Sequence, residues 1–263
     1  MRKRAMGSAQ ASIVKMAGHR NERDFADLIG GSYNPSHNQG KHDVVDAQGR
    51  RHSVKAGTWW QVFLYGRERL STNTELEKIG NLTELMVACL DAFPENFAEY
   101  VGNKKAAKCR LQKPMQELLA EMEKPEIFKK FLTMALFNGD DAEYLSMYIG
   151  QAKNEKTRKI FHVFHKEDVV NAIVSDITLR NSKARNRTQM DDQKIILYSS
   201  RLSKNIGEIE DRHDSEKHYK QMKFRLNAKS VFDILTKNIK HQEQVKAMPQ
   251  IYTYGCAVGM FNK

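Results

Sequence analysis

Hydrophobic and polar positions along the chain follow two periods, one typical of helices and one of strands. Apolar residues recur every three to four positions over 9–29, and Gly30-Gly31 ends that pattern. The same spacing continues through the middle of the chain, at Leu76, Ile79, Leu82, Leu85, Met86, Cys89, Leu90, Phe93, Met115, Leu118, Leu119 and Met122, and after Pro125 at Phe128, Phe131, Leu132, Ala135 and Leu136. We therefore expect a helix over 9–29 and a helical block within 71–150.

Short runs rich in β-branched and aromatic residues predict strands on both sides of this block. Residues 31–40, GSYNPSHNQG, have the composition of a loop, and Gly49 suits a tight hairpin turn. The expected strands are 41–45, 52–56, 59–65, 159–165, 194–200, 207–212, 220–227 and 251–261, with helices over 166–175 and 229–239. The expected fold is α/β (or α+β), with a central mixed sheet flanked by helices.

Composition indicates an ordinary globular protein. No apolar run approaches the length of a transmembrane helix, and the start MRKRAMGSAQ has no apolar segment behind its basic residues. The three cysteines are widely spaced, which indicates reduced thiols in a cytoplasmic protein. Without a repeat, a low-complexity tract or a linker, residues 1–263 are expected to form a single domain.

The formal net charge of +11 is unevenly distributed. Residues 1–70 carry +6, residues 71–150 carry −4 and residues 151–263 carry +9. A basic excess of this size favours an anionic partner. We therefore expect an electropositive face built from both ends of the chain.

The first basic segment contains a candidate hydrolytic site on its predicted hairpin. If the turn centres near Gln48, Asp43 lies close to Ser53 and Lys55 on the paired strand. Phosphodiester hydrolysis needs a hard divalent cation and a positive group beside it. Asp43 and the carbonyl of Val54 would hold Mg²⁺, and Lys55 would position the attacking water on the metal.

Glu22 is the second candidate acid. In the predicted helix it shares one face with Phe25, Ala26 and Ile29, which are apolar. A glutamate on an apolar face needs a partner, which a metal-bound water or Lys55 would supply. A simple surface ion pair between Asp43 and Lys55, with Glu22 at the edge of the apolar face, is the non-catalytic alternative.

The order of helix glutamate, aspartate, hairpin and strand lysine resembles the PD-(D/E)xK nuclease superfamily. The segments NERDFADLI, KHDVVDAQGRRHSVKAG and WWQVFLYG are similar to type II restriction endonucleases. The resemblance covers residues 18–65 and implies that Asp43, Lys55 and Glu22 are catalytic. His42 replaces the usual proline and Ser53 the second acid, so metal binding would be weaker or limited to one ion, and Asp46 could replace that acid only through a bulge.

Three clusters mix basic side chains with amides and hydroxyls, the groups that contact phosphates and base edges. The DNA-binding candidates are Asn38, Gln39, Lys41, Arg180, Asn181, Lys183, Arg185, Asn186, Arg187, Gln189, Arg212, His213, Lys217 and His218. His162 and His165 point to opposite faces of a strand and are not expected to bind metal. Trp59 and Trp60 are expected at the edge and in the core of their strand.

Together these observations favour a Mg²⁺-dependent type II restriction endonuclease that cleaves double-stranded DNA as a homodimer. A repair or recombination nuclease with the same site is one alternative. A DNA-binding protein without catalytic activity is another.

Overall fold

The computed structural model describes residues 8–33, 42–149, 159–187 and 189–262, without the side chains of residues 8–15 and 17. The chain divides into two compact units, each assembled from separate segments. The first comprises Met1–Thr58, Asp140–Val169 and Thr236–Lys263, and the second comprises Trp59–Gly139 and Val170–Leu235. Among the described residues, no helix is long and apolar enough to cross a membrane.

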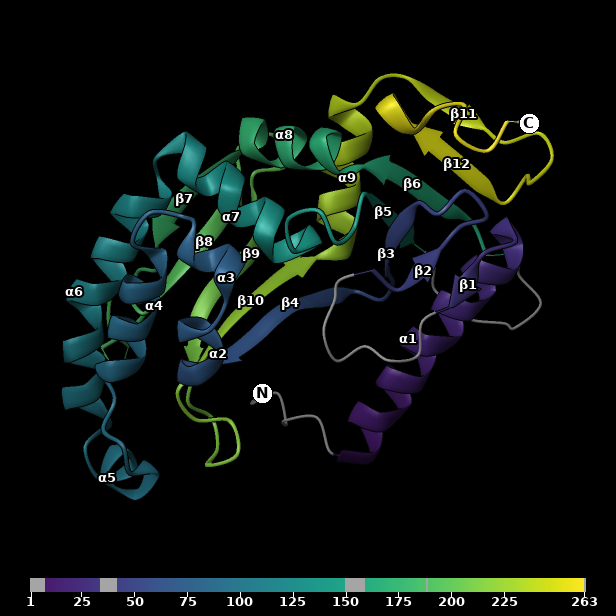
Figure 1. The fold of residues 1–263 in the computed structure, drawn as a ribbon. Coiled ribbons are helices and arrows are strands. Elements are labelled where there is room, and N and C mark those ends of the chain that lie inside the picture. The colour runs from purple at the N-terminus through teal and green to yellow at the C-terminus, as the bar shows by residue number, and fades with distance from the viewer. Residues whose placement is uncertain (1–7, 34–41, 150–158, 188, 263) are drawn as a thin grey trace. The chain divides into compact units, whose positions relative to one another are not determined.

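The first unit contains a seven-stranded mixed sheet in the order β1-β2-β3-β5-β6-β12-β11 (Figure 1). Its elements are α1 (Ser8–Ile29), β1 (Ser32–Tyr33), β2 (Val44–Val45), β3 (Arg51–Lys55), β5 (Tyr144–Tyr148), β6 (Phe161–His165), β11 (Gln242–Gln244), β12 (Ile251–Tyr254) and a 3₁₀ turn, Gly255–Ala257. The pairs β3–β5 and β6–β12 are parallel, and the other pairs are antiparallel.

Helix α1 packs its apolar stripe on this sheet. Phe25 and Ala26 are buried, and the Phe25 ring lies 5.0 Å from that of Phe161 on β6. The helix ends at Gly30, whose φ of +63° is the left-handed conformation that glycine adopts without strain. The amide of Gly31 then donates to the Ala26 carbonyl at 2.8 Å, which directs the chain into β1.

The second unit contains a five-stranded antiparallel sheet in the order β4-β10-β9-β8-β7. Its strands are β4 (Trp59–Gly66), β7 (Ile177–Asn181), β8 (Lys194–Ser199), β9 (Lys204–Arg212) and β10 (Gln221–Asn227). Its helices are α2 (Arg67–Ser71), α3 (Thr74–Glu77), α4 (Leu82–Asp91), α5 (Phe97–Gly102), α6 (Lys104–Met122) and α7 (Pro125–Phe137). Helices α8 (Lys166–Asp176) and α9 (Ala228–Asn238) each contribute residues to both units.

The expected mixture of helices and a mixed sheet is confirmed, with two differences. Residues 255–261 do not continue the last strand, because the positive φ of Gly255 starts a 3₁₀ turn. The sequence did not predict β1, which lies in the expected loop 31–40, or β5, β7 and β11, and the predicted strands separate into two sheets. Trp60 is buried and Trp59 is 47% exposed, as expected for core and edge positions.

Candidate functional site

The β2–β3 hairpin has the expected register and turn. Val44 pairs with His52, and the amide of Asp46 donates to the Arg50 carbonyl at 2.9 Å. Gly49 has a φ of +80°, which such a turn requires. At the end of the hairpin the amide of Asp43 donates to the His52 carbonyl at 2.7 Å, which holds Asp43 beside β3, and Ser53 and Lys55 share one face of that strand.

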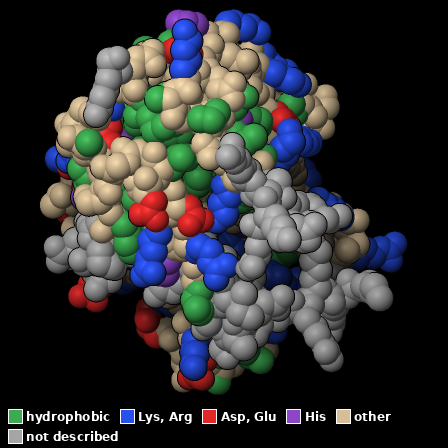
Figure 2. All heavy atoms as spheres, turned by 90° about the vertical axis from the view of Figure 1, so that its right-hand side faces the viewer, with side chains coloured by type: hydrophobic (Ala, Val, Ile, Leu, Met, Phe, Trp, Pro, Cys, Tyr) green, Lys and Arg blue, Asp and Glu red, His purple; other side chains and the backbone are tan. Residues whose placement is uncertain are grey.

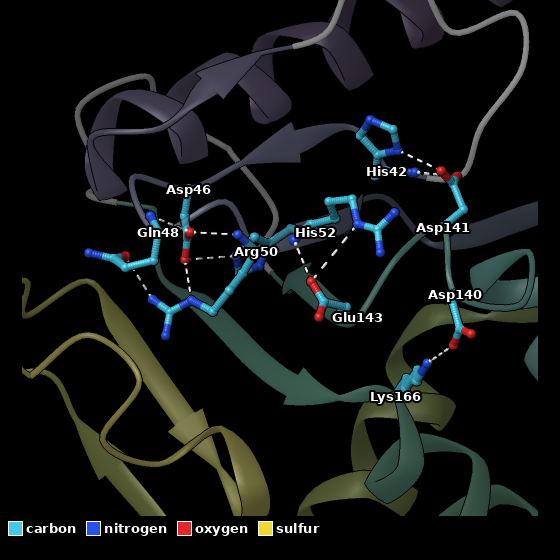
Figure 3. Close-up of polar contacts among 10 residues, drawn as sticks. His42, Asp46, Gln48, Arg50, His52, Asp140, Asp141, Glu143 and Lys166 are labelled. Carbon is cyan, nitrogen blue, oxygen red and sulfur yellow. Dashed lines mark hydrogen bonds and ion pairs between the residues drawn. The ribbon is translucent and has the colours of Figure 1, made fainter.

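Asp46 holds the turn together. Its carboxylate accepts hydrogen bonds at 2.9 Å from the amides of Gln48 and Arg50, and at 2.6 Å from the Arg50 side chain (Figure 3). Burial disfavours its charged form, but the interactions with His52 and Arg50 outweigh burial and lower the pKa of Asp46. The Asp46 carboxylate therefore stabilises the hairpin turn and does not replace the missing second motif acid.

Asp43, Val54 and Lys55 converge at the end of this hairpin. The Oδ2 of Asp43 accepts hydrogen bonds from the Val54 amide at 2.7 Å and from the Lys55 Nζ at 3.1 Å. The same Nζ donates to the Val54 carbonyl at 3.3 Å. Asp43 is buried, with 8% of its surface exposed, whereas Lys55 is partly exposed. The expected proximity of the acid and the lysine is confirmed.

The two expected metal ligands both contact the Lys55 side chain. The Asp43 carboxylate and the Val54 carbonyl already point to one positive group, the Lys55 ammonium. Two oxygen ligands are few for Mg²⁺, so phosphate oxygens and waters would complete its coordination. Among the described residues, no group of three His, Cys, Asp or Glu side chains is placed to hold a metal ion.

Ser53, which occupies the position of the second motif acid, is fully buried. Its hydroxyl has no hydrogen-bond partner among the described residues. The side chain therefore does not reach solvent in this conformation.

Glu22 belongs to a polar cluster that includes two residues the sequence analysis missed. Its Oε2 lies 3.1 Å from the Nδ1 of His19, which in turn lies 2.8 Å from the hydroxyl of Tyr33 on β1. Burial raises the pKa of Tyr33, and the charges of Glu22 and Asp43 raise it further, so both acids lie near the phenol. His19 precedes Glu22 by one helical turn, which is a usable sequence signal. Tyr33 lies in a segment with loop composition and has no such signal.

Two acidic residues, Asp141 and Glu143, connect the segment before β5 to the β2–β3 hairpin (Figure 3). The Nδ1 of His42 lies 2.8 Å from Asp141, and the amide of Arg51 donates to the Glu143 carboxylate at 3.1 Å. His42 occupies the usual proline position directly before Asp43. Its contact with Asp141 thus connects the hairpin to the segment that leads into β5.

A buried histidine on β3 forms an acid–histidine–serine arrangement. The Nδ1 of His52 lies 3.0 Å from the Ser146 hydroxyl, and its Nε2 lies 3.6 Å from Asp46. All three residues are buried, and burial lowers the pKa of His52. A substrate cannot reach this serine without unfolding, so the arrangement supports the core and not nucleophilic catalysis.

The described DNA-binding candidates come from two segments of the second unit, and one pocket is lined by members of both: Arg180, Asn181, Lys183, Arg185, Gln189 and His213. Arg180 and Asn181 end β7, and Lys183, Arg185, Asn186, Arg187 and Gln189 lie in the loop between β7 and β8. Arg212, His213, Lys217 and His218 are at the end of β9 and in the following segment. His213 stacks on Phe93 with 5.0 Å between ring centroids, and burial lowers its pKa. Asn38, Gln39 and Lys41 lie outside the described residues.

His162 and His165 both lie on β6, where side chains three positions apart extend to opposite faces. The Nδ1 of His162 lies 2.9 Å from the Tyr254 hydroxyl, and burial lowers its pKa to about 4. On the face that Figure 2 shows, Lys and Arg side chains are interspersed with Asp and Glu side chains among the described atoms. The expected electropositive face therefore remains a prediction.

Comparison with protein-family models gives no match for this chain, and comparison with curated proteins gives none either.

Proposed function

We propose that this protein is a Mg²⁺-dependent type II restriction endonuclease that cleaves double-stranded DNA at a short specific site. The observation that supports this proposal best is the convergence of the Asp43 carboxylate, the Val54 carbonyl and the Lys55 ammonium within hydrogen-bonding distance. Since DNA sites of this kind are commonly two-fold symmetric, the active form would be a homodimer, acting in the cytoplasm.

In the proposed reaction, each side chain has a defined task. Asp43 and the Val54 carbonyl would hold Mg²⁺, which when bound supplies stabilisation of negative charge on the scissile phosphate. Lys55 would orient the attacking water and neutralise charge that develops on the phosphate oxygens. Glu22 would act together with His19 and Tyr33, which interact with its carboxylate. Ser53 would place an uncharged side chain beside Asp43, at the position of the second motif acid.

Basic and amide side chains of the second unit would bind the DNA. Arg185, Arg187 and Lys183 are exposed and would contact phosphates, while Asn186 and Gln189 would reach base edges. Phosphate contacts of this kind make affinity fall steeply with salt concentration. A basic net charge of +11 supports this assignment, although it does not separate specific from general DNA binding.

The proposal is tested with mixed-sequence plasmid DNA and Mg²⁺, comparing the wild type with Asp43→Ala and Lys55→Ala. Discrete fragments that both substitutions abolish support a restriction enzyme. A smear that both substitutions abolish supports a repair or recombination nuclease instead. If DNA is retarded on a gel but stays uncut, the Asp43–Lys55 pair is an ion pair of a non-catalytic DNA-binding protein.

A further inference from the structure

A pocket in the second unit lies where β7 ends and β8 begins, and it encloses about 590 Å³. This volume is in the range of small-molecule sites. The loop that forms one wall is held in place by α6, because Gln116 donates to Asp192 at 2.7 Å and Gln112 to the Asp191 carbonyl at 3.3 Å. Asp191 in turn accepts from the Ala184 amide at 2.6 Å. The pocket is therefore present before any ligand arrives.

Basic side chains line this pocket and make it suitable for an anion. Lys108 comes from α6, Arg185 from the loop and Arg180 from β7. Arg180 is fixed in position, since its guanidinium stacks 3.8 Å from the Tyr198 ring centroid and donates to Asn205. Two acids also line the wall. The carboxylate of Glu210 interacts with Lys194 and Lys223, and burial raises the pKa of Asp211 well above its usual value, which favours its uncharged form.

Two amide oxygens of the pocket lining, on Gln193 and Asn181, are acceptors that lack a donor among the described residues. The NH₂ of Gln193 donates to the carbonyls of Lys108 and Asp191 at 2.9 and 3.1 Å, which leaves its Oε1 without a partner among the described residues. The Oδ1 of Asn181 has none either. A phosphate carries no N–H to offer these oxygens, whereas the exocyclic amine of a nucleobase does.

We infer that this pocket binds a single nucleotide of the DNA, with its phosphate against Lys108 and Arg185 and its base amine against Gln193 and Asn181. The inference rests on the proposed function only in taking DNA as the source of the nucleotide. Both oxygens are buried in the wall, so binding of the base requires the Asn181 and Gln193 side chains to turn toward the pocket. The exocyclic amine of adenine, cytosine or guanine offers two hydrogens, one for each amide oxygen, whereas thymine offers only its single N3–H, so the pocket binds thymine with one hydrogen bond fewer.

Saturation-transfer NMR with the full chain and each of the four deoxynucleoside 5′-monophosphates tests this inference. EDTA is present throughout, so the result does not depend on Mg²⁺ or on cleavage. We expect dAMP, dCMP and dGMP to bind, and dTMP to bind about fivefold more weakly, the effect of one lost hydrogen bond. The double variant Lys108→Ala/Arg185→Ala should weaken binding at least about tenfold, because it removes charge-assisted contacts.

The double variant Lys129→Ala/Lys130→Ala is the matched control, since it removes the same charge from exposed positions of α7. It should bind as the wild type does, and so should Asp43→Ala. Absence of transfer to any nucleotide, or equal loss in both double variants, overturns the inference. Equal binding of all four nucleotides together with competition by inorganic phosphate reduces the site to an anion site and overturns the assignment of the base. None of these results bears on whether the hairpin site cleaves DNA.

Discussion

The Nζ of Lys55 lies 3.1 Å from the Oδ2 of Asp43, and both side chains extend from one end of the β2–β3 hairpin. The same ammonium contacts the Val54 carbonyl, so one positive group lies between the two oxygens expected to hold a metal. This relationship places the acid, the cation and the backbone acceptor within reach of a single phosphate group.

Replacing Lys55 by methionine should abolish cleavage and leave the fold nearly unchanged. The pair is partly exposed, and ion pairs of this kind contribute about 1 kcal/mol or less to stability. Loss of the charge that stabilises the phosphate should reduce the cleavage rate by about a hundredfold or more. Plasmid cleavage and thermal unfolding of the same preparations measure the two effects.

Lys166→Met is the control for this substitution, because Lys166 forms an ion pair with Asp140, which is largely exposed. Its cleavage rate should equal that of the wild type. Equal rates for Lys55→Met and the wild type would show that the Asp43–Lys55 pair has no part in the chemistry.

Tyr33→Phe should slow cleavage by about tenfold to a hundredfold through loss of positioning. The variant lacks the hydroxyl that lies 2.8 Å from the His19 ring, while the aromatic ring remains. Because the pKa of Tyr33 is raised, the hydroxyl is protonated near neutral pH, so the pH of maximal rate should not move. Initial rates over a pH series test this, with Tyr252→Phe as the control, and a shifted optimum or an unchanged rate contradicts it.

The stability of the protein should fall as the pH decreases below neutrality. His162 has a pKa of about 4 in the folded state because burial disfavours its charged form. The unfolded chain takes up this proton near about pH 6.5, so between these values acid favours unfolding. His162 should contribute a loss of roughly 2 kcal/mol between about pH 7.5 and pH 5.

Urea unfolding at the two pH values measures this loss. His162→Phe should reduce the difference by about the stated amount, whereas His241→Phe, which changes an exposed histidine, should not. An identical pH dependence for His162→Phe and the wild type would refute the assignment to His162.

Gly31→Ala should destabilise the protein by about 1 to 3 kcal/mol. A Cβ at this position would lie 2.5 Å from the Val45 carbonyl oxygen, so α1 and β2 would have to separate. Gly18→Ala is the opposite case, since nothing lies within 4 Å of its added Cβ on the helix, and it should stabilise by up to about 1 kcal/mol. Thermal unfolding compares the two, and equal effects would contradict the proposed contact.

The two units also illustrate why some elements escaped prediction. Only three residues separate β3 from β4, and both have strand composition, yet they belong to different sheets. Composition reports that a segment favours a strand but not which partner it pairs with, because pairing depends on distant segments. Strand β7 carries Arg180 and Asn181 at its end, and their polarity made the segment resemble a loop.

The sequence by itself determined the α/β class, the helix that carries Glu22 and the hairpin that brings Asp43 beside Lys55. These follow from helical periodicity, strand alternation and a short turn, all of which act over a few residues. Only the tertiary structure decided that Tyr33 joins His19 and Glu22, and that His52 contacts Ser146. These contacts depend on the path of the chain after Gly30 and on which side chains pack together in the core. The spacing of residues along the sequence determines neither.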